Sequence, residues 1–172
     1  MNVFKMIDFI GTKNPDYTYE KVKDELPSKP VKGKGYLNGN GRQGEWESRY
    51  DYGNGELVRN GTYKDDKEDG EFEDRFNGKL YSKGSYKNGT EEGVWEYYNP
   101  STGLLSEKGS YKNGEKDGIW DTYFDKDKID TSYTYKNGLY HGEYMIRLPT
   151  GGFEFGVYEN GKLIKKNGKL IK

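Results

Sequence analysis

The sequence predicts an all-β protein made of one elongated, single-layer antiparallel sheet of consecutive β-hairpin repeats. Two glycines recur in a fixed relation with a period of 23 to 26 residues, which lies in the range of repeat architectures. Around them lie short segments in which aromatic and polar residues alternate, as they do in strands. Asn-Gly pairs separate these segments, and Asn-Gly is a strong signal for a tight hairpin turn. Each repeat is therefore expected to form one hairpin that stacks only on its neighbours.

The composition suits a thin sheet better than a thick two-layer core. Only 31% of the 172 residues are hydrophobic, and 17 Tyr, 7 Phe and 3 Trp supply much of that fraction. The 25 Gly suit tight turns and close approach of rings to bare backbone. Disordered chains are poor in aromatic residues, so this composition favours a folded protein. The absence of cysteine excludes disulfides and thiolate metal sites.

Six repeat units can be aligned on a first glycine. The units start at Gly35, Gly61, Gly84, Gly109, Tyr133 and Gly156, so that a tyrosine replaces the glycine in the fifth unit. A second glycine follows nine residues after each of the first five starts, at Gly44, Gly70, Gly93, Gly118 and Gly142. The period varies because the connection between units varies in length, which costs little free energy.

We expect the aromatic residues of the two strands of a hairpin to lie directly opposite each other. In this register Tyr86 faces Trp95, Tyr111 faces Trp120, and both glycines of a unit lie on the side of the rings. The same register pairs Lys64 with Glu71 and Lys136 with Glu143. One face of the sheet then carries a row of rings that forms its core: Trp46, Tyr63, Phe72, Tyr86, Trp95, Tyr111, Trp120, Tyr135, Tyr144 and Tyr158.

The opposite face is expected to be solvated, with basic and acidic columns that neutralise each other. Tyr98 and Tyr123 interrupt a column that arginine otherwise occupies, so they can form an exposed aromatic spot. Acidic residues also gather in the turns, and residues 61–131 hold 17 acidic against 11 basic residues. The candidate partner-binding residues are Glu96, Tyr98, Asp121, Tyr123, Glu91, Glu92 and Asp117.

Three segments can be distinguished along the chain. Residues 1–32 precede the repeats and are expected to cap the open end of the sheet, with a short helix between Tyr17 and Leu26 as one option and a separate functional arm as the alternative. Residues 33–161 hold five repeats and the start of a terminal partial one. Residues 162–172 form a basic strand or tail with five lysines and no acid. Such lysines protect a sheet edge, and attraction to anionic lipid is the alternative.

The motif Gly-x-Tyr-Lys-Asn-Gly-x-x-x-Gly-x-Trp resembles the MORN repeat family, and most closely its bacterial MORN-variant subfamily, which is described as antitoxin-like. The resemblance covers about residues 35–161 and is strongest from Tyr86 to Trp95 and from Tyr111 to Trp120. The chain departs from the pattern at Leu37, at Asp65-Asp66 in place of Asn-Gly, and at Tyr133. The resemblance implies binding and scaffolding roles, sometimes at membranes, and an antitoxin- or immunity-like activity.

Little in the sequence points to catalysis. His141 is the single histidine, which leaves a triad or a histidine metal site without partners, and we expect it to be a turn residue. The turn carboxylates lack the spacing of a calcium loop, and no phosphate-binding or nucleophile motif occurs. We therefore expect no enzyme activity, no metal and no cofactor.

Two classes of function remain open. The first is a protein-binding module, in which the acidic middle of the chain suits a basic partner. The second is binding of carbohydrate or the cell envelope, which rows of Tyr and Trp also serve; an anionic-lipid scaffold is a further alternative. Nucleic acid is not expected, because no broad basic footprint is present. The chain start does not resemble a signal peptide, no segment approaches the roughly 18 apolar residues of a membrane span, and cysteine is absent, so a cytoplasmic location is expected.

Overall fold

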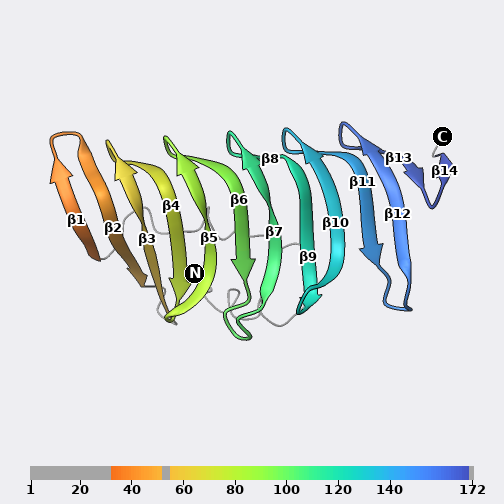
Figure 1. The fold of residues 1–172 in the computed structure, drawn as a ribbon, viewed down its shortest axis with the longest axis horizontal. Coiled ribbons are helices and arrows are strands. Elements are labelled where there is room, and N and C mark those ends of the chain that lie inside the picture. The colour runs from red at the N-terminus through yellow and green to blue at the C-terminus, as the bar shows by residue number, and fades with distance from the viewer. Residues whose placement is uncertain (1–31, 52–54, 171–172) are drawn as a thin grey trace.

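The computed structural model describes residues 32–51 and 55–170, and all regular secondary structure within these ranges is β-strand. The strands form one antiparallel sheet whose spatial order follows the chain order, as the row of arrows in Figure 1 shows. This confirms the expected all-β fold of consecutive hairpins. The expected N-terminal cap and its helix lie outside the described residues, apart from Lys32. No helix in the described part is long and apolar enough to cross a membrane.

Within residues 32–51 and 55–170, fourteen strands make up the sheet. They are β1 (Lys32–Asn38), β2 (Gly41–Asp51), β3 (Glu56–Lys64), β4 (Lys67–Phe76), β5 (Lys79–Lys87), β6 (Thr90–Tyr98), β7 (Leu105–Lys112), β8 (Glu115–Lys116), β9 (Gly118–Asp125), β10 (Lys128–Lys136), β11 (Leu139–Arg147), β12 (Phe153–Glu159), β13 (Lys162–Lys166) and β14 (Lys169–Leu170). Strands β8 and β9 are two parts of one hairpin strand, because both pair with β7 and only Asp117 separates them.

Six hairpin turns among the described residues consist of Asn followed by Gly, with positive φ at both, and the turn between β3 and β4 consists of Asp65-Asp66, with φ of 50° and 65°. In the hairpin of β5 and β6, Lys87 pairs with Thr90 across Asn88 (φ 52°) and Gly89 (φ 82°). This is the backbone of a type I′ turn, whose twist matches that of the flanking strands. Asn enters the left-handed region more readily than most residues with a side chain. The turn therefore fixes the register of the hairpin from its tip.

The expected pairing of Tyr86 with Trp95 is wrong. Tyr86 lies opposite Glu91, and the register then slips by two residues, so that Lys83 pairs with Glu96. The three residues from 93 to 95 thus lie opposite Gly84 alone, which is a β-bulge. The rings of Tyr86 and Trp95 still meet, because diagonal neighbours on one face lie within reach of large side chains.

The other expected pairs are wrong for the same reason. Tyr111 lies opposite Lys116 rather than Trp120. Next to the turns, Lys64 pairs with Lys67 and Lys136 pairs with Leu139, so neither lysine faces the expected glutamate. In each hairpin the strands pair directly after the two-residue turn. The bulge follows these first pairs and brings the rings of the two strands into contact.

The two glycines of a repeat have different roles, and only the first lies beneath a ring. A Cβ atom on Gly84 would lie 2.6 Å from Trp95 Cγ and nearer still to two other ring atoms, so the ring packs on bare backbone. The second glycine, Gly93, has a φ of 76° and nothing within 4 Å of its missing Cβ. The left-handed backbone of the bulge requires this glycine. The expectation that both glycines line the rings is therefore corrected.

The fifth unit shows how the sheet accommodates Tyr133 in place of the first glycine. Tyr144 lies opposite Tyr133 on one side and Gly156 on the other. Its ring packs over Gly156, where a Cβ atom would lie 2.8 Å from Tyr144 Cζ. The rings of Tyr133 and Tyr144 stack with centroids 5.6 Å apart and an interplanar angle of 14°. The ring row continues because one ring uses the glycine of the following repeat.

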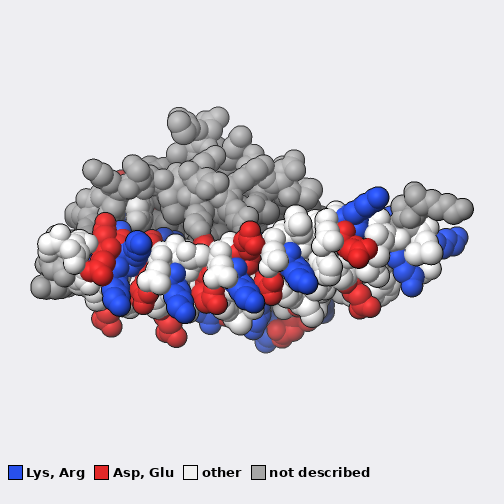
Figure 2. All heavy atoms as spheres, turned by 90° about the horizontal axis from the view of Figure 1, so that it is seen from above, with Lys and Arg blue, Asp and Glu red and all other residues white. Residues whose placement is uncertain are grey.

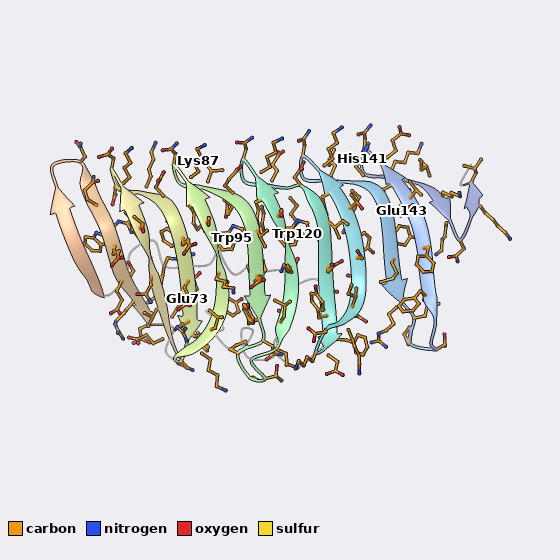
Figure 3. The ribbon with its side chains drawn as sticks, viewed as in Figure 1. Glu73, Lys87, Trp95, Trp120, His141 and Glu143 are labelled. Carbon is orange, nitrogen blue, oxygen red and sulfur yellow. The ribbon has the colours of Figure 1, made fainter. Side chains whose placement is uncertain are left out.

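The rings predicted as core lie on one face of the sheet, called the aromatic face from here on. Seven of the ten are buried, and Trp46, Tyr135 and Tyr158 are partly buried. Neighbouring rings meet edge to face, as in the Tyr111–Trp120 pair at 4.9 Å, and each such pair stabilises the sheet by about 0.5–1.5 kcal/mol. Figure 3 shows Trp95 and Trp120 at mid-height of neighbouring hairpins. Tyr97, which sequence analysis did not identify, stacks between these two rings at 6.0 and 6.3 Å.

The aromatic face also holds residues that sequence analysis did not place there. A second buried apolar cluster consists of Tyr50, Leu57 and Phe76. Arg59 and Asp74 form a buried ion pair, with Nε–Oδ1 at 2.9 Å and Nη2–Oδ2 at 3.0 Å. Ser82 Oγ donates a further hydrogen bond to Asp74 Oδ2 at 3.1 Å. The charges tolerate burial because both carboxylate oxygens of Asp74 have donors.

Candidate functional site

The face opposite the aromatic face, called the outer face from here on, carries the charged columns expected from the sequence. Side chains alternate along a strand, so Trp95 and Tyr97 are buried on the aromatic face while Glu96 and Tyr98 belong to the outer face. The same alternation places Asp121 and Tyr123 on the outer face of the next hairpin. These four candidate residues therefore share one face, on neighbouring repeats.

Glu96 is the centre of a charge cluster. Lys83 and Lys108, on the strands to either side, donate to its two oxygens at 2.8 and 2.9 Å. The Tyr98 hydroxyl donates to Glu96 Oε2 at 2.6 Å. These donors, Lys83 first, lower the pKa of Glu96 to about 2. Glu96 and Tyr98 are thus engaged within the chain, and a partner would have to replace contacts that already exist.

Asp121 and Tyr123 form no comparable cluster. Lys108 lies opposite Asp121 in the sheet, but its ammonium group pairs with Glu96. Asp121 Oδ1 is buried and has no hydrogen-bond partner in the described part of the chain. Burial raises the pKa of the Tyr123 hydroxyl above its ordinary value. The expected exposed spot of Tyr98 and Tyr123 is therefore half-buried on both repeats.

The turn acids predicted as partner-binding residues connect the repeats to one another. Glu92 Oε2 accepts a hydrogen bond from the backbone N–H of Asn113 at 2.9 Å. Asp117 Oδ2 accepts one from Asn137 N–H at 3.4 Å. The backbone carbonyl of Glu91, which is itself buried, accepts the Gly114 N–H at 3.0 Å. Each of these bonds runs from one turn to the repeat before it.

His141 occupies the same position in the fifth unit. Its Nδ1 accepts the backbone N–H of Asn160 at 3.3 Å, as Glu92 and Asp117 accept the equivalent N–H in earlier repeats. Figure 3 shows His141 at the edge of the sheet where the hairpin turns lie. Viewed onto this edge in Figure 2, acidic and basic side chains alternate along the row of turns. Glu92, Asp117 and His141 therefore have a structural role at this edge.

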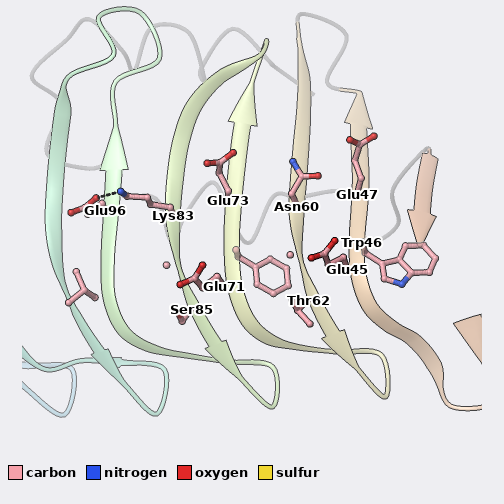
Figure 4. A pocket seen from close by; sticks show the side chains of 14 residues that line it. Glu45, Trp46, Glu47, Asn60, Thr62, Glu71, Glu73, Lys83, Ser85 and Glu96 are labelled. Atoms are coloured by element: carbon pink, nitrogen blue, oxygen red, sulfur yellow. Dashed lines mark ion pairs between the residues drawn. The ribbon is translucent and has the colours of Figure 1, made fainter. Parts of the chain in front are cut away.

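A groove on the outer face, which sequence analysis did not identify, crosses strands β2 to β6. It has a volume of about 900 Å³. Figure 4 shows two rows of side chains across the strands: Glu47, Asn60, Glu73, Lys83 and Glu96 in one row, and Glu45, Thr62, Glu71 and Ser85 in the other. Gly61 and Gly84 lie between the rows and leave the floor without side chains on two strands. Five carboxylates and one lysine line the groove.

The carboxylates of the groove differ in how far they are neutralised. Arg49 Nε pairs with Glu47 at 2.9 Å, and Arg75 Nε pairs with Glu73 at 2.6 Å. Glu45 and Glu71, in contrast, are exposed, and neither forms an ion pair within the described residues. They lie on strands β2 and β4, and β3 runs between these strands. The two strands are therefore about 10 Å apart by the usual strand spacing. The groove therefore holds two carboxyl groups that no cation of the described part of the chain pairs with.

The bulge explains why sequence analysis missed this site. The expected register neutralised Glu71 with Lys64, whereas the structure places Glu71 opposite Ser85 on one side and within the bulge on the other. The equivalent residues of later repeats are Val94 and Ile119, which are 55% and 61% exposed. The outer face is thus acidic over the first repeats and carries exposed aliphatic side chains further along.

Among the described residues, no group of three or more His, Cys, Asp or Glu side chains is arranged to hold a metal ion. No protein-family model matches the sequence, and no curated protein matches it. Among solved structures, a chain of the crystal structure titled "Crystal structure of GtfA/B complex" is 15% identical, with 83% of this chain and 24% of that chain covered and a TM-score of 0.26. A TM-score this low carries no argument about this chain.

Proposed function

We propose that this protein is a non-catalytic protein-binding module that holds a basic segment of a partner in the groove of its outer face. The observation that carries the proposal is the pair of exposed carboxylates, Glu45 and Glu71, in a groove that has five acids and one lysine. A partner lysine or arginine placed there gains a charge-assisted hydrogen bond without displacing an internal one. Electrostatic complementarity of this kind favours fast and specific association.

The construction of the sheet supports this role. The rings hold each hairpin to the next on the aromatic face, and backbone and side-chain bonds connect the turns along one edge. The outer face is thus a fixed surface on which side chains alone can vary, and repeat proteins use such extended surfaces for binding. A pre-organised surface also spends less free energy on ordering when a partner binds.

Toxin neutralisation is the narrower form of the proposal, and it comes from the resemblance to MORN-variant repeats. A proteinaceous toxin with a basic surface segment would fit the groove by charge. Absence of catalysis and a cytoplasmic location belong to the same proposal and stay predictions.

The alternatives receive less support. Sugar binding on rows of rings needs accessible ring faces, whereas Trp95, Trp120 and Tyr86 are at most 5% exposed. Binding to anionic lipid depends on the basic C-terminal segment, in which Lys162, Lys165, Lys166 and Lys169 are exposed. It predicts that deletion of residues 162–172 abolishes sedimentation with anionic vesicles, and unchanged sedimentation after the deletion would contradict it.

The groove proposal can be tested by affinity capture with a charge-matched pair of variants. The wild-type chain, the variant Glu45→Gln/Glu71→Gln and the control Glu115→Gln/Glu159→Gln are each immobilised and exposed to native lysate. The control removes the same charge from exposed acids outside the groove. Wild type and control are expected to retain one stoichiometric basic protein, identified by mass spectrometry. The groove variant should bind the purified partner at least about 10-fold more weakly, since a hydrogen bond to a charged group contributes about 1.5–3 kcal/mol.

The outcomes separate the functions. Equal affinity of all three chains for the same partner would show that the groove is not the binding site. Retention on insoluble glycan, with no protein captured, would favour the carbohydrate alternative. Binding that weakens steeply with salt in wild type but not in the groove variant would support the charge mechanism.

A further inference from the structure

Among the described residues, six of the Asn-Gly pairs share one backbone conformation. Each forms a two-residue turn with φ between 46° and 52° at Asn and between 74° and 82° at Gly. The pairs are Asn77-Gly78, Asn88-Gly89, Asn113-Gly114, Asn137-Gly138, Asn160-Gly161 and Asn167-Gly168. All six asparagines are exposed. Local backbone and solvent access therefore do not distinguish one pair from another.

The hydrogen bonds divide the six turns into two classes. In four of them the glycine N–H donates to a backbone carbonyl of the preceding repeat, at 2.7 to 3.0 Å: Gly89 to Glu68, Gly114 to Glu91, Gly138 to Lys116 and Gly161 to Tyr140. In the other two, the asparagine N–H makes the equivalent bond, to Glu56 and Phe155. The amides of Gly78 and Gly168 donate no hydrogen bond within the described residues.

The asparagine side chains differ in the same two classes. The backbone N–H of Glu56 donates to Asn77 Oδ1 at 3.0 Å, and that of Phe155 donates to Asn167 Oδ1 at 3.1 Å. A donor on this oxygen stabilises the negative charge that develops there when a nucleophile attacks Cγ. The other four asparagines have no such donor among the described residues.

These contacts affect the spontaneous deamidation of asparagine, a reaction to which Asn-Gly sequences are chemically suited. The glycine amide nitrogen loses its proton and attacks Asn Cγ, the N–Cγ bond forms, and the Cγ–Nδ2 bond breaks with release of ammonia. Water then opens the resulting succinimide at either carbonyl, which gives aspartate or isoaspartate. A hydrogen bond that holds the amide proton opposes the first step, as it opposes hydrogen exchange.

We infer that, among these six turns, Asn77 and Asn167 are the sites at which the folded chain deamidates through a succinimide. Their glycine amides donate no hydrogen bond to any described residue and their Cγ carbonyls are polarised, whereas the four turns joined to the preceding repeat through glycine are protected. The inference is independent of the groove and of any partner. Isoaspartate lengthens the backbone by one methylene, so it would disrupt the two-residue turn between β4 and β5 and that between β13 and β14.

The test is peptide mapping of the full chain by liquid chromatography and mass spectrometry during incubation in mildly alkaline buffer. Conversion at Asn77 and Asn167 is expected to exceed conversion at each of the other four sites by about 10-fold, the factor that corresponds to one net hydrogen bond. A parallel sample in concentrated urea should lose this difference. Equal rates in the folded chain, or fast conversion at one of the two sites alone, would overturn the inference. The same ranking in urea would also overturn it, because local sequence would then set the rates.

Discussion

Replacement of Gly84 by alanine tests whether the rings really pack on bare backbone. The added Cβ would lie 2.6 Å from Trp95 Cγ and closer to two further ring atoms, whereas carbon atoms in contact prefer about 3.5–4.0 Å. The indole would have to move by roughly 1 Å or more. Trp95 is 1% exposed and contacts the rings of Tyr86, Tyr97 and Tyr111, so it has no free space to move into.

The expected cost follows from these contacts. Overpacking of a core costs about 1–3 kcal/mol, and each edge-to-face pair that is lost adds about 0.5–1.5 kcal/mol. Alanine recovers about 0.5–1 kcal/mol, because glycine in a strand is entropically unfavourable. We therefore expect Gly84→Ala to lower the free energy of unfolding by about 2–4 kcal/mol.

Urea denaturation followed by tryptophan fluorescence and circular dichroism measures this cost, with Gly93→Ala as the matched control. Gly93→Ala places a Cβ in open space. It should therefore lower the free energy of unfolding only by the cost of a left-handed backbone at alanine, about 1–2 kcal/mol. The decisive comparison is made in a Trp95→Leu background. There Gly84→Ala should become nearly neutral while Gly93→Ala keeps its cost. If Gly84→Ala costs the same in both backgrounds, the ring does not lie on this glycine and the reasoning fails.

Three further changes test the rest of the structure. Asp74→Ala leaves Arg59 buried without its bidentate partner and should destabilise the protein by about 3 kcal/mol in urea denaturation, whereas a loss below about 1 kcal/mol would show that the pair is solvated. The pKa of Glu96, lowered from 4.5 to about 2, implies stability that is present above about pH 4.5 and lost as the pH falls toward 2. Because the cluster is partly solvated, this contribution should be no more than about 1 kcal/mol. Wild type and Glu96→Gln should therefore converge in urea midpoint as the pH falls through this range, and a constant difference would contradict the assignment. Glu92→Ala removes the acceptor of the Asn113 N–H and should cost about 1 kcal/mol, with faster hydrogen exchange at that amide as the site-specific readout.

The fold class could be predicted because the repeat makes its signals redundant. Aromatic and polar residues alternate, Asn-Gly marks the turns, and the period of 23 to 26 residues lies in the range of repeat architectures. Each signal appears five or six times, so departures such as Tyr133 do not change the conclusion. The structure shows why this one is tolerated: Tyr144 turns to Gly156 when the preceding glycine is absent.

The register could not be predicted with the same success, because two features act against each other over a few residues. The two-residue turn places Tyr86 opposite Glu91, and the bulge at Gly93 then moves Trp95 opposite Gly84. Direct pairing of the rings required neither feature and was the simpler interpretation. The signal that could have revealed the bulge is the second glycine itself, which stands nine residues after the start of each of the first five units.

The candidate site was missed for a related reason. The binding residues predicted from the sequence include Glu96, Glu92 and Asp117, and in the structure all three form contacts within the chain. The expected register pairs Glu71 with Lys64, and nothing in the sequence pattern singles out Glu45. Only the observed register shows which acidic side chains form an ion pair within the sheet and which do not.

The same bulge gives the sheet a position where repeats can differ without affecting the fold. The residue after the second glycine is exposed in all five units, as Glu45, Glu71, Val94, Ile119 and Glu143. The bulge removes this residue from the cross-strand register of its own hairpin, and the alternation of the strand directs it away from the rings. Neither the core nor the turns therefore constrain its chemistry. The second glycine thus creates a column of exposed side chains, and the proposed groove takes Glu45 and Glu71 from it.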